Sequence, residues 1–146
     1  MEERTYHPDE ALLLKNQLCF PLYAAARKVI GAYTPLLKPY GITYTQYITF
    51  LVLWEKDGIT VGDIGARLHL DNGTLTPLLK KMEAEGFITR RRSTEDERKV
   101  TVYLTPEGLD MKEKLKDVPL KIGHCLPIGQ EDAKTLYRIL YKILDI

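Results

Sequence analysis

Two cysteines, Cys19 and Cys125, are the residues of this chain whose side chains could carry out redox chemistry. An accessible thiolate is a nucleophile and can be oxidised to a sulfenic acid or a disulfide. The two residues lie 106 positions apart, which does not match the spacing of a zinc site. In a reducing compartment we expect free or redox-active thiols. Taken alone, the apolar sequence around Cys19 favours a buried, inert thiol.

A second set of candidate residues is a group of cations between positions 80 and 99. The net charge of the whole chain is only +1, so a DNA-binding role requires positive charge to be concentrated locally. Three acidic residues at positions 95–97 dilute the group without removing it. The cations are Lys80, Lys81, Arg90, Arg91, Arg92, Arg98 and Lys99.

Residues 60–105 are expected to position these cations as a winged helix-turn-helix. Thr60 and Asp63 predict a capped helix start, and turn-forming residues at 71–73 separate this helix from a second one, roughly Gly73 to Glu85. Pro77 requires a start near Gly73 or Thr74 if it is to lie in the first turn. Gly86 is placed to cap the end of the second helix.

The segment after Gly86 has the pattern of a two-stranded ribbon. Residues 87–90 have strand character, residues 93–98 form a charged loop, and residues 100–104 alternate and are β-branched. A helix, a turn, a second helix and a ribbon with a charged tip are specific to a DNA-binding module only as a set.

The second helix of such a module lies in the major groove. We expect its polar residues Asn72, Thr74 and Thr76 to face base edges or phosphates, and Lys80 and Lys81 to contact the phosphate backbone. In the ribbon, Arg98 is a candidate for the minor groove, Asp96 is placed to brace the Arg98 guanidinium or the loop, and Arg90 is a further candidate contact.

The rest of the chain predicts helices on both sides of the winged unit. A helix over 8–33 is expected to kink near Cys19 because of Pro21, and residues 34–41 are expected to form a connector. A largely apolar helix over 44–56, with a cap at Thr43 and Gln46, is expected in the core. Helices are expected from Pro106 and over 130–144, with an undecided segment at 117–129.

These patterns predict a mainly α fold with a small β-ribbon in a single domain over 1–146. Residues 44–105 form the winged-helix region with its supporting helix, and residues 8–40 and 106–146 supply dimerisation helices. A homodimer would suit a palindromic operator in double-stranded DNA. We find no metal site, no cofactor motif, no secretory signal and no membrane span, so a cytoplasmic location is the default.

The motifs of this chain resemble the MarR family of transcriptional regulators, and in particular its OhrR-type organic hydroperoxide sensors. The resemblance covers about residues 12–118. It is carried by Asp96-Glu97-Arg98-Lys99-Val100 in the ribbon, by Asn16-Gln17-Leu18-Cys19-Phe20 with Tyr23, by Ile42-Thr43-Tyr44-Thr45-Gln46-Tyr47, and by the run from Leu70 to Lys80.

The resemblance implies that Cys19 is the peroxide-sensing thiol of a repressor that leaves DNA when an organic hydroperoxide oxidises it. It also implies that Tyr33 and Tyr44 contact the thiol, and Tyr23 lies one helical turn from Cys19. Tyr33 is fourteen residues from Cys19, or about 21 Å along a straight helix. A Tyr33 contact therefore requires the partner chain, with the sensor pocket across the dimer interface.

Cys125 resembles the second, resolving cysteine of the two-cysteine members of this family, which forms an intersubunit disulfide with the oxidised sensor. It falls in the undecided segment, and a disulfide would require its Cα atom to lie within about 7 Å of that of Cys19.

Two alternative functions stay open at this point. One is a MarR-type regulator that binds a small aromatic or phenolic ligand, with Cys19 silent. The other is a thiol peroxidase, although no arginine lies near Cys19 in sequence except Arg27, two turns away.

Overall fold

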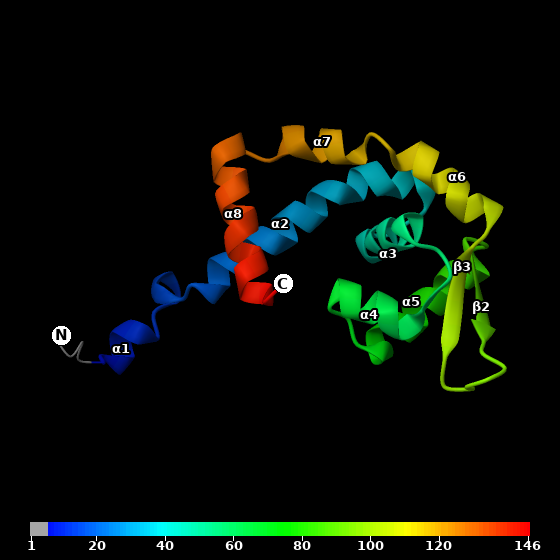
Figure 1. Ribbon diagram of the computed structural model, residues 1–146. Helices are drawn as coiled ribbons and strands as arrows, with labels where there is room; N and C mark the ends of the chain where they lie inside the picture. Colours follow the sequence, from blue (N-terminus) through cyan, green and yellow to red (C-terminus); the bar gives the residue numbers. More distant parts are fainter. Residues whose placement is uncertain (1–5) are drawn as a thin grey trace.

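The computed structural model describes residues 6–146 and is mainly helical with one small sheet, which confirms the predicted fold class (Figure 1). The first five residues of the predicted domain lie outside the described residues. In chain order the elements are α1 (Pro8–Ala11), η1 (Leu14–Asn16), α2 (Cys19–Leu37), η2 (Lys38–Tyr40), α3 (Tyr44–Glu55), β1 (Ile59–Thr60), α4 (Val61–Leu68), α5 (Asn72–Ala84), β2 (Ile88–Arg92), β3 (Val100–Leu104), α6 (Pro106–Leu115), α7 (Val118–Cys125) and α8 (Gln130–Leu144).

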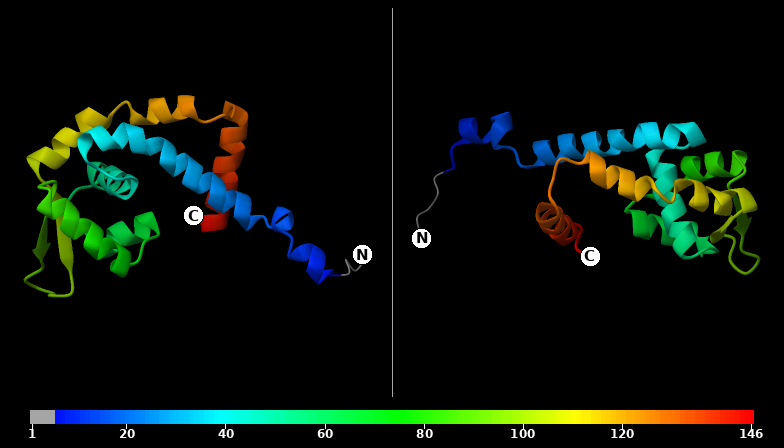
Figure 2. Two further views of the ribbon diagram at one scale, coloured as in Figure 1. Left: turned by 180° about the vertical axis from the view of Figure 1, so that it is seen from behind. Right: turned by 90° about the horizontal axis from the view of Figure 1, so that it is seen from above.

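The two ends of the molecule differ in character. Helices α3, α4 and α5 gather with the strands at one end, whereas α1 projects away from the body at the other end (Figure 2). The long helix α2 connects the two ends, and α7 packs against it.

Helix α3 is the central core helix, as the sequence predicts. The Thr43 hydroxyl accepts the N–H of Gln46, and the Gln46 side chain accepts the N–H of Thr43, so the predicted reciprocal cap is present. Phe50 is fully buried and stacks on Trp54, whose indole N–H donates to the carbonyl of Gly108 in α6 at 3.0 Å. Buried side chains from the surrounding elements close the core: Ile64, Leu75, Leu79, Met82, Ile88, Val102, Met111 and Leu115.

The predicted helix-turn-helix is present as α4 and α5. Thr60 and Asp63 cap each other at the start of α4. Asp71 caps α5 by accepting the N–H of Thr74 at 2.7 Å. Gly86 follows α5 with a φ of 83°, the left-handed conformation that a glycine cap provides.

The turn between α4 and α5 depends on a close approach at Gly65. A Cβ on this residue would lie 2.7 Å from the carbonyl oxygen of Leu70 and 3.1 Å from Cδ1 of Leu75. The position of Pro77 differs from the prediction, because it is the sixth residue of α5 and lies outside the first turn. It therefore leaves the carbonyl of Gly73 without its intrahelical donor.

The predicted ribbon of β2 and β3 is confirmed, with Arg90 opposite Val102 in an antiparallel register. A third strand, β1, was not predicted; it pairs Ile59 with Val102 and gives a sheet of order β1-β3-β2. This short strand fastens the start of α4 to the ribbon.

The predicted kinked helix over 8–33 is wrong. The structure contains α1, a 3-10 turn and then α2, which begins at Cys19 and contains Pro21 as its third residue. The backbone nitrogen at that position has no intrahelical partner, so proline causes no break there. α2 also continues through Pro35 into the predicted connector.

The segment after the ribbon confirms two predicted helices and contains a third in the stretch that the sequence left undecided. Thr105 caps α6, and α8 spans the predicted 130–144. The segment 117–129 contains helix α7 in addition to irregular chain.

The terminal elements leave many apolar side chains exposed in the single chain, and no residue of α8 is buried. Within residues 6–146, no helix has both the length and the apolar character needed to cross a membrane. The exposed apolar side chains of these elements include Leu12, Leu13, Leu14, Leu18, Phe20, Leu22, Leu136, Tyr137, Ile139, Tyr141 and Ile143.

Candidate DNA interface and thiol site

A cationic cleft of about 490 Å³ lies between α5 and the ribbon. From α5 it is lined by Asn72, Thr76 and Lys80, which are spaced four residues apart and so share one helix face. Among residues 6–146, five cations and no acidic residue line the cleft, and this charge suits it to a polyanion. The cations are Lys80, Arg90, Arg92, Arg98 and Lys99.

Three of the predicted DNA-contacting residues do not line this cleft. The Thr74 backbone is engaged in the α5 cap, and Lys81 lies 4.0 Å from Glu85 on another helix face. Asp96 lies in the ribbon loop. Arg92 and Lys99 do line it, and both belong to the predicted cationic group although neither was predicted as a DNA contact.

Hydrogen bonds within the loop between β2 and β3 fix its shape. The Asp96 carboxylate accepts the N–H of Arg98 at 3.0 Å, so it braces the loop backbone and not the guanidinium. Arg92 donates to the carbonyl of Glu97 at 2.9 Å, and the Ser93 hydroxyl accepts the N–H of Asp96. The Arg98 side chain is exposed at this ordered tip.

Arg90 is joined to the recognition helix by an ion pair. Its guanidinium donates to Glu83 at 3.0 Å, and its N–H donates to the other carboxylate oxygen of Glu83 at 2.8 Å. These hydrogen bonds lower the pKa of Glu83. The pair connects α5 to β2, so Arg90 orients the ribbon against the helix as well as lining the cleft.

Cys19 is the first residue of α2 and is exposed in the single chain. The first turn of a helix favours negative charge because its N–H groups have no intrahelical acceptors. Tyr23, one turn away, is also exposed, and the guanidinium of Arg27 lies 5.5 Å from its ring centre. The N-terminal end of α2 therefore presents a thiol, a phenol and a cation together.

Tyr33 and Tyr44, the other two predicted thiol contacts, are in contact with each other and with Tyr47. The ring centres of Tyr33 lie 4.9 Å from Tyr44 and 5.6 Å from Tyr47. Burial raises the pKa of each hydroxyl, most strongly for Tyr47, whose pKa is raised to about 12 with further contributions from Tyr33 and Tyr44. All three hydroxyls therefore stay protonated at neutral pH and are hydrogen-bond donors.

The structure separates Cys19 from this tyrosine cluster (Tyr33, Tyr44 and Tyr47) within one chain. Cys19 and Tyr33 lie on the single helix α2, so about 21 Å of helix separates them. Sequence reasoning missed Tyr47, although its place three residues after Tyr44 on the same helix was a usable signal.

Cys125 is the last residue of α7 and is exposed. The segment that the sequence left undecided is therefore helical as far as Cys125. The start of α7 packs beside Pro35, near the other end of α2 from Cys19. Within residues 6–146, no group of three or more histidine, cysteine or carboxylate side chains could hold a metal ion.

Comparison with known proteins places these features in a family context. The family model of the transcriptional regulators SarA/Rot matches residues 32–115. The organic hydroperoxide resistance transcriptional regulator of Bacillus subtilis (strain 168) is 49% identical over 132 residues, which is 90% of each chain.

Structures of AbfR, a protein of Staphylococcus epidermidis, give the structural comparison. Reduced AbfR bound to DNA is 36% identical, with a TM-score of 0.78 over 95% of this chain and 97% of its own. Disulfide-formed AbfR is also 36% identical, with a TM-score of 0.65 over 94% and 96%. Overoxidised AbfR bound to DNA has the same TM-score of 0.78, so the conformation described here is more similar to the DNA-bound structures than to the disulfide-formed one.

Proposed function

Because this chain belongs to the SarA/Rot family of transcriptional regulators and is a MarR-type regulator akin to the organic hydroperoxide sensors, we propose that it is a redox-controlled repressor. It binds operator DNA as a homodimer and is released when an organic hydroperoxide oxidises Cys19. The operator is palindromic, since a two-fold protein reads two equivalent half-sites. A location in the reducing cytoplasm keeps the thiol available for oxidation.

The observation that carries the DNA-binding part is the cationic cleft between α5 and the ribbon. Its cations come from α5, β2 and the hydrogen-bonded loop before β3, and no carboxylate of the described residues lines it. Asn72 and Thr76 are on the α5 face that borders the cleft, where they are placed to reach base edges. Lys80 and Arg98 supply phosphate and minor-groove contacts.

The sensing step is an oxidation of the Cys19 thiolate. Its sulfur attacks the terminal, hydrogen-bearing oxygen of the hydroperoxide, the O–O bond breaks, and the alkyl-bearing oxygen leaves and takes a proton from solvent to form an alcohol. The sulfur is oxidised to a sulfenic acid. The thiol of Cys125 then attacks this sulfur, forming a disulfide and releasing water.

The Cys19 thiolate is held by tyrosine hydroxyls of the partner protomer. Tyr33 and Tyr44 are half-buried and stay protonated, and a phenol that makes no hydrogen bond within residues 6–146 is suited to donate to a thiolate. The length of α2 prevents Tyr33 from reaching Cys19 of its own chain. The exposed apolar side chains near Cys19, Leu18 and Phe20 among them, are expected to be covered in the dimer.

The test combines covalent state with DNA binding. Wild type, Cys19→Ser and Cys125→Ser are treated with one equivalent of cumene hydroperoxide and analysed by intact mass, non-reducing gel and binding to a selected duplex. We expect a covalent dimer in wild type only, and release of wild type from DNA. An oxidised Cys19 monomer that persists in both wild type and Cys125→Ser would remove the resolving role of Cys125. An unreactive Cys19 would remove the sensor.

A ligand-controlled regulator is the second candidate, because an apolar cleft of about 460 Å³ lies next to the tyrosine cluster. Ile30, Leu37, Ile42 and Tyr44 are among its lining residues. Loss of DNA binding on addition of a phenolic compound to reduced Cys19→Ser protein would favour it. The thiol peroxidase alternative is not supported, because the family and the relatives above are regulators of transcription.

A further inference from the structure

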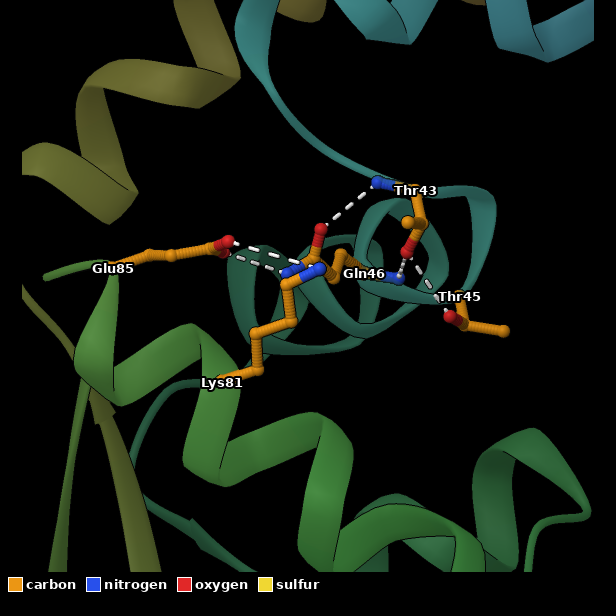
Figure 3. Close-up of polar contacts among 5 residues, drawn as sticks. All are labelled: Thr43, Thr45, Gln46, Lys81 and Glu85. Atoms are coloured by element: carbon orange, nitrogen blue, oxygen red, sulfur yellow. Dashed lines mark hydrogen bonds and ion pairs between the residues drawn. The ribbon is translucent and has the colours of Figure 1, made fainter.

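Gln46 is a fully buried polar residue in α3, with a side chain that is 0% exposed. Its carbonyl oxygen accepts the N–H of Thr43 at 2.9 Å, and its amide nitrogen donates to the carboxylate of Glu85 at 2.8 Å (Figure 3). A buried amide with both ends satisfied prefers one position, because moving it would leave a polar group unpaired.

Glu85 lies at the C-terminal cap of the recognition helix α5. A carboxylate is unfavourable at this end of a helix, where the free carbonyl groups carry partial negative charge. Two groups offset that cost: the Gln46 amide and the Lys81 ammonium, the latter 4.0 Å away (Figure 3). The Glu85 carboxylate is thus held against α3 by its hydrogen bond with Gln46, although a carboxylate at this position does not stabilise α5 itself.

Gln46 lies between two residues of the tyrosine cluster along α3. Tyr44 is the first residue of α3 and Tyr47 follows Gln46 directly, and both rings pack against Tyr33. Because Thr43, Tyr44 and Gln46 share the first turn of α3, a shift of Tyr44 also moves the cap and the Gln46 amide.

Most contacts between α3 and α5 are apolar and can slide. Phe50 and Leu53 of α3 belong to the same buried apolar cluster as Leu75, Leu79 and Met82 of α5, and such packing has no directional bonds. Within residues 6–146, the bond from Gln46 to Glu85 is the only side-chain hydrogen bond between α3 and α5 with its C-cap.

We infer that Gln46 and Glu85 are positioning residues that couple the tyrosine cluster to the recognition helix. In the reduced protein their hydrogen bond fixes the orientation of α5 for the operator. A change in the tyrosine cluster on oxidation shifts the first turn of α3 and, through Gln46, the end of α5. This inference rests on the proposed function, since it assigns the route by which the thiol site controls DNA binding.

The test uses the full-length dimer and a duplex selected by reduced wild type from random-sequence DNA. Its readout is the ratio of the dissociation constants after and before oxidation with cumene hydroperoxide. Gln46→Glu places a second carboxylate against Glu85 while keeping the acceptor for Thr43. The double variant Gln46→Glu with Glu85→Gln restores the hydrogen bond with donor and acceptor exchanged. Glu85→Ala removes the acceptor at a partly exposed position, in case Gln46→Glu does not fold.

We expect reduced Gln46→Glu and Glu85→Ala to bind about tenfold more weakly, which corresponds to about 1.4 kcal/mol, with an oxidation ratio close to one. The double variant should recover most of the wild-type ratio, which a purely structural role in folding would not predict. A wild-type ratio in Gln46→Glu or Glu85→Ala, or no recovery in the double variant, overturns the inference. If oxidation leaves the dissociation constant of wild type unchanged, the proposed function is overturned, and this inference with it.

Discussion

Gly65 gives the sharpest test of how the helix-turn-helix is held together. The substitution Gly65→Ala adds a methyl group 2.7 Å from the carbonyl oxygen of Leu70 and 3.1 Å from Cδ1 of Leu75. The carbonyl belongs to the turn before α5, so it cannot move aside as a flexible side chain would. The Gly65 carbonyl also accepts the N–H of Leu70 at 3.0 Å, which holds the two backbones together.

Two opposing effects determine how much Gly65→Ala changes the free energy of unfolding. Alanine is favoured over glycine in a helix by about 1 kcal/mol, whereas overpacking of a rigid contact costs about 1–3 kcal/mol. Because the clash is with backbone, we expect the upper part of that range and a net loss of about 1–2 kcal/mol. For a chain of this size that is a fall in Tm of about 2–8 °C.

The matched control is Gly62→Ala in the same helix. Its Cβ would meet only the Thr60 hydroxyl, at 3.7 Å, which is ordinary contact. We expect no loss of stability there. Both variants are compared by thermal unfolding at one protein concentration, because dimer formation makes Tm depend on concentration. Equal Tm values for the two variants would refute the assigned role of the Gly65 contact.

Three further predictions concern the cleft, the loop and the tyrosine cluster. Lys80→Ala and Arg98→Ala should each weaken DNA binding and reduce the salt dependence of log Kd by about one phosphate contact. The control Lys112→Ala on α6 should change neither quantity. An unchanged salt dependence in Lys80→Ala would show that Lys80 does not contact a phosphate. Asp96→Ala should weaken DNA binding about threefold to tenfold by loosening the loop, without changing Tm. Asp96→Asn keeps an acceptor for the Arg98 N–H and should bind DNA as wild type does. If both variants lose the same DNA affinity, the effect comes from the charge of Asp96 and not from this hydrogen bond. The pKa of Tyr47 is raised from 10.0 to about 12 in the folded state, so its contribution to stability is complete below pH 10 and is lost as the pH rises towards 12. In denaturant unfolding, Tyr47→Phe should therefore lessen the loss of unfolding free energy at alkaline pH, whereas Tyr6→Phe at an exposed position should not.

The sequence predicted those features that depend on a few neighbouring residues. The caps at Thr43 and Thr60 were correct because each needs only a hydroxyl and the N–H groups that follow it. Strand β3 was predicted with its observed bounds, because its alternation is local.

The features that were missed depend on partners distant in sequence or on where a helix begins. Strand β1 has two residues and exists only through its pairing with β3. The bond from Gln46 to Glu85 spans 39 positions. Pro21 was expected to kink a helix that begins at Pro8. Because α2 begins at Cys19, only two residues before Pro21, the missing N–H of the proline costs no intrahelical hydrogen bond.

The length of α2 determines which molecule performs the sensing. One helix carries Cys19 at its start and Tyr33 fourteen residues later, so in the proposed dimer each pocket takes its sulfur from one chain and its phenols from the other. Two defective alleles would then complement each other. A mixed dimer of a Cys19→Ser chain and a Tyr33→Phe chain places both lesions in one pocket and leaves the second pocket intact, although neither parent homodimer contains a complete one. The functional unit of the proposed peroxide response is therefore the pair of chains, and partial function should appear when both alleles are expressed together.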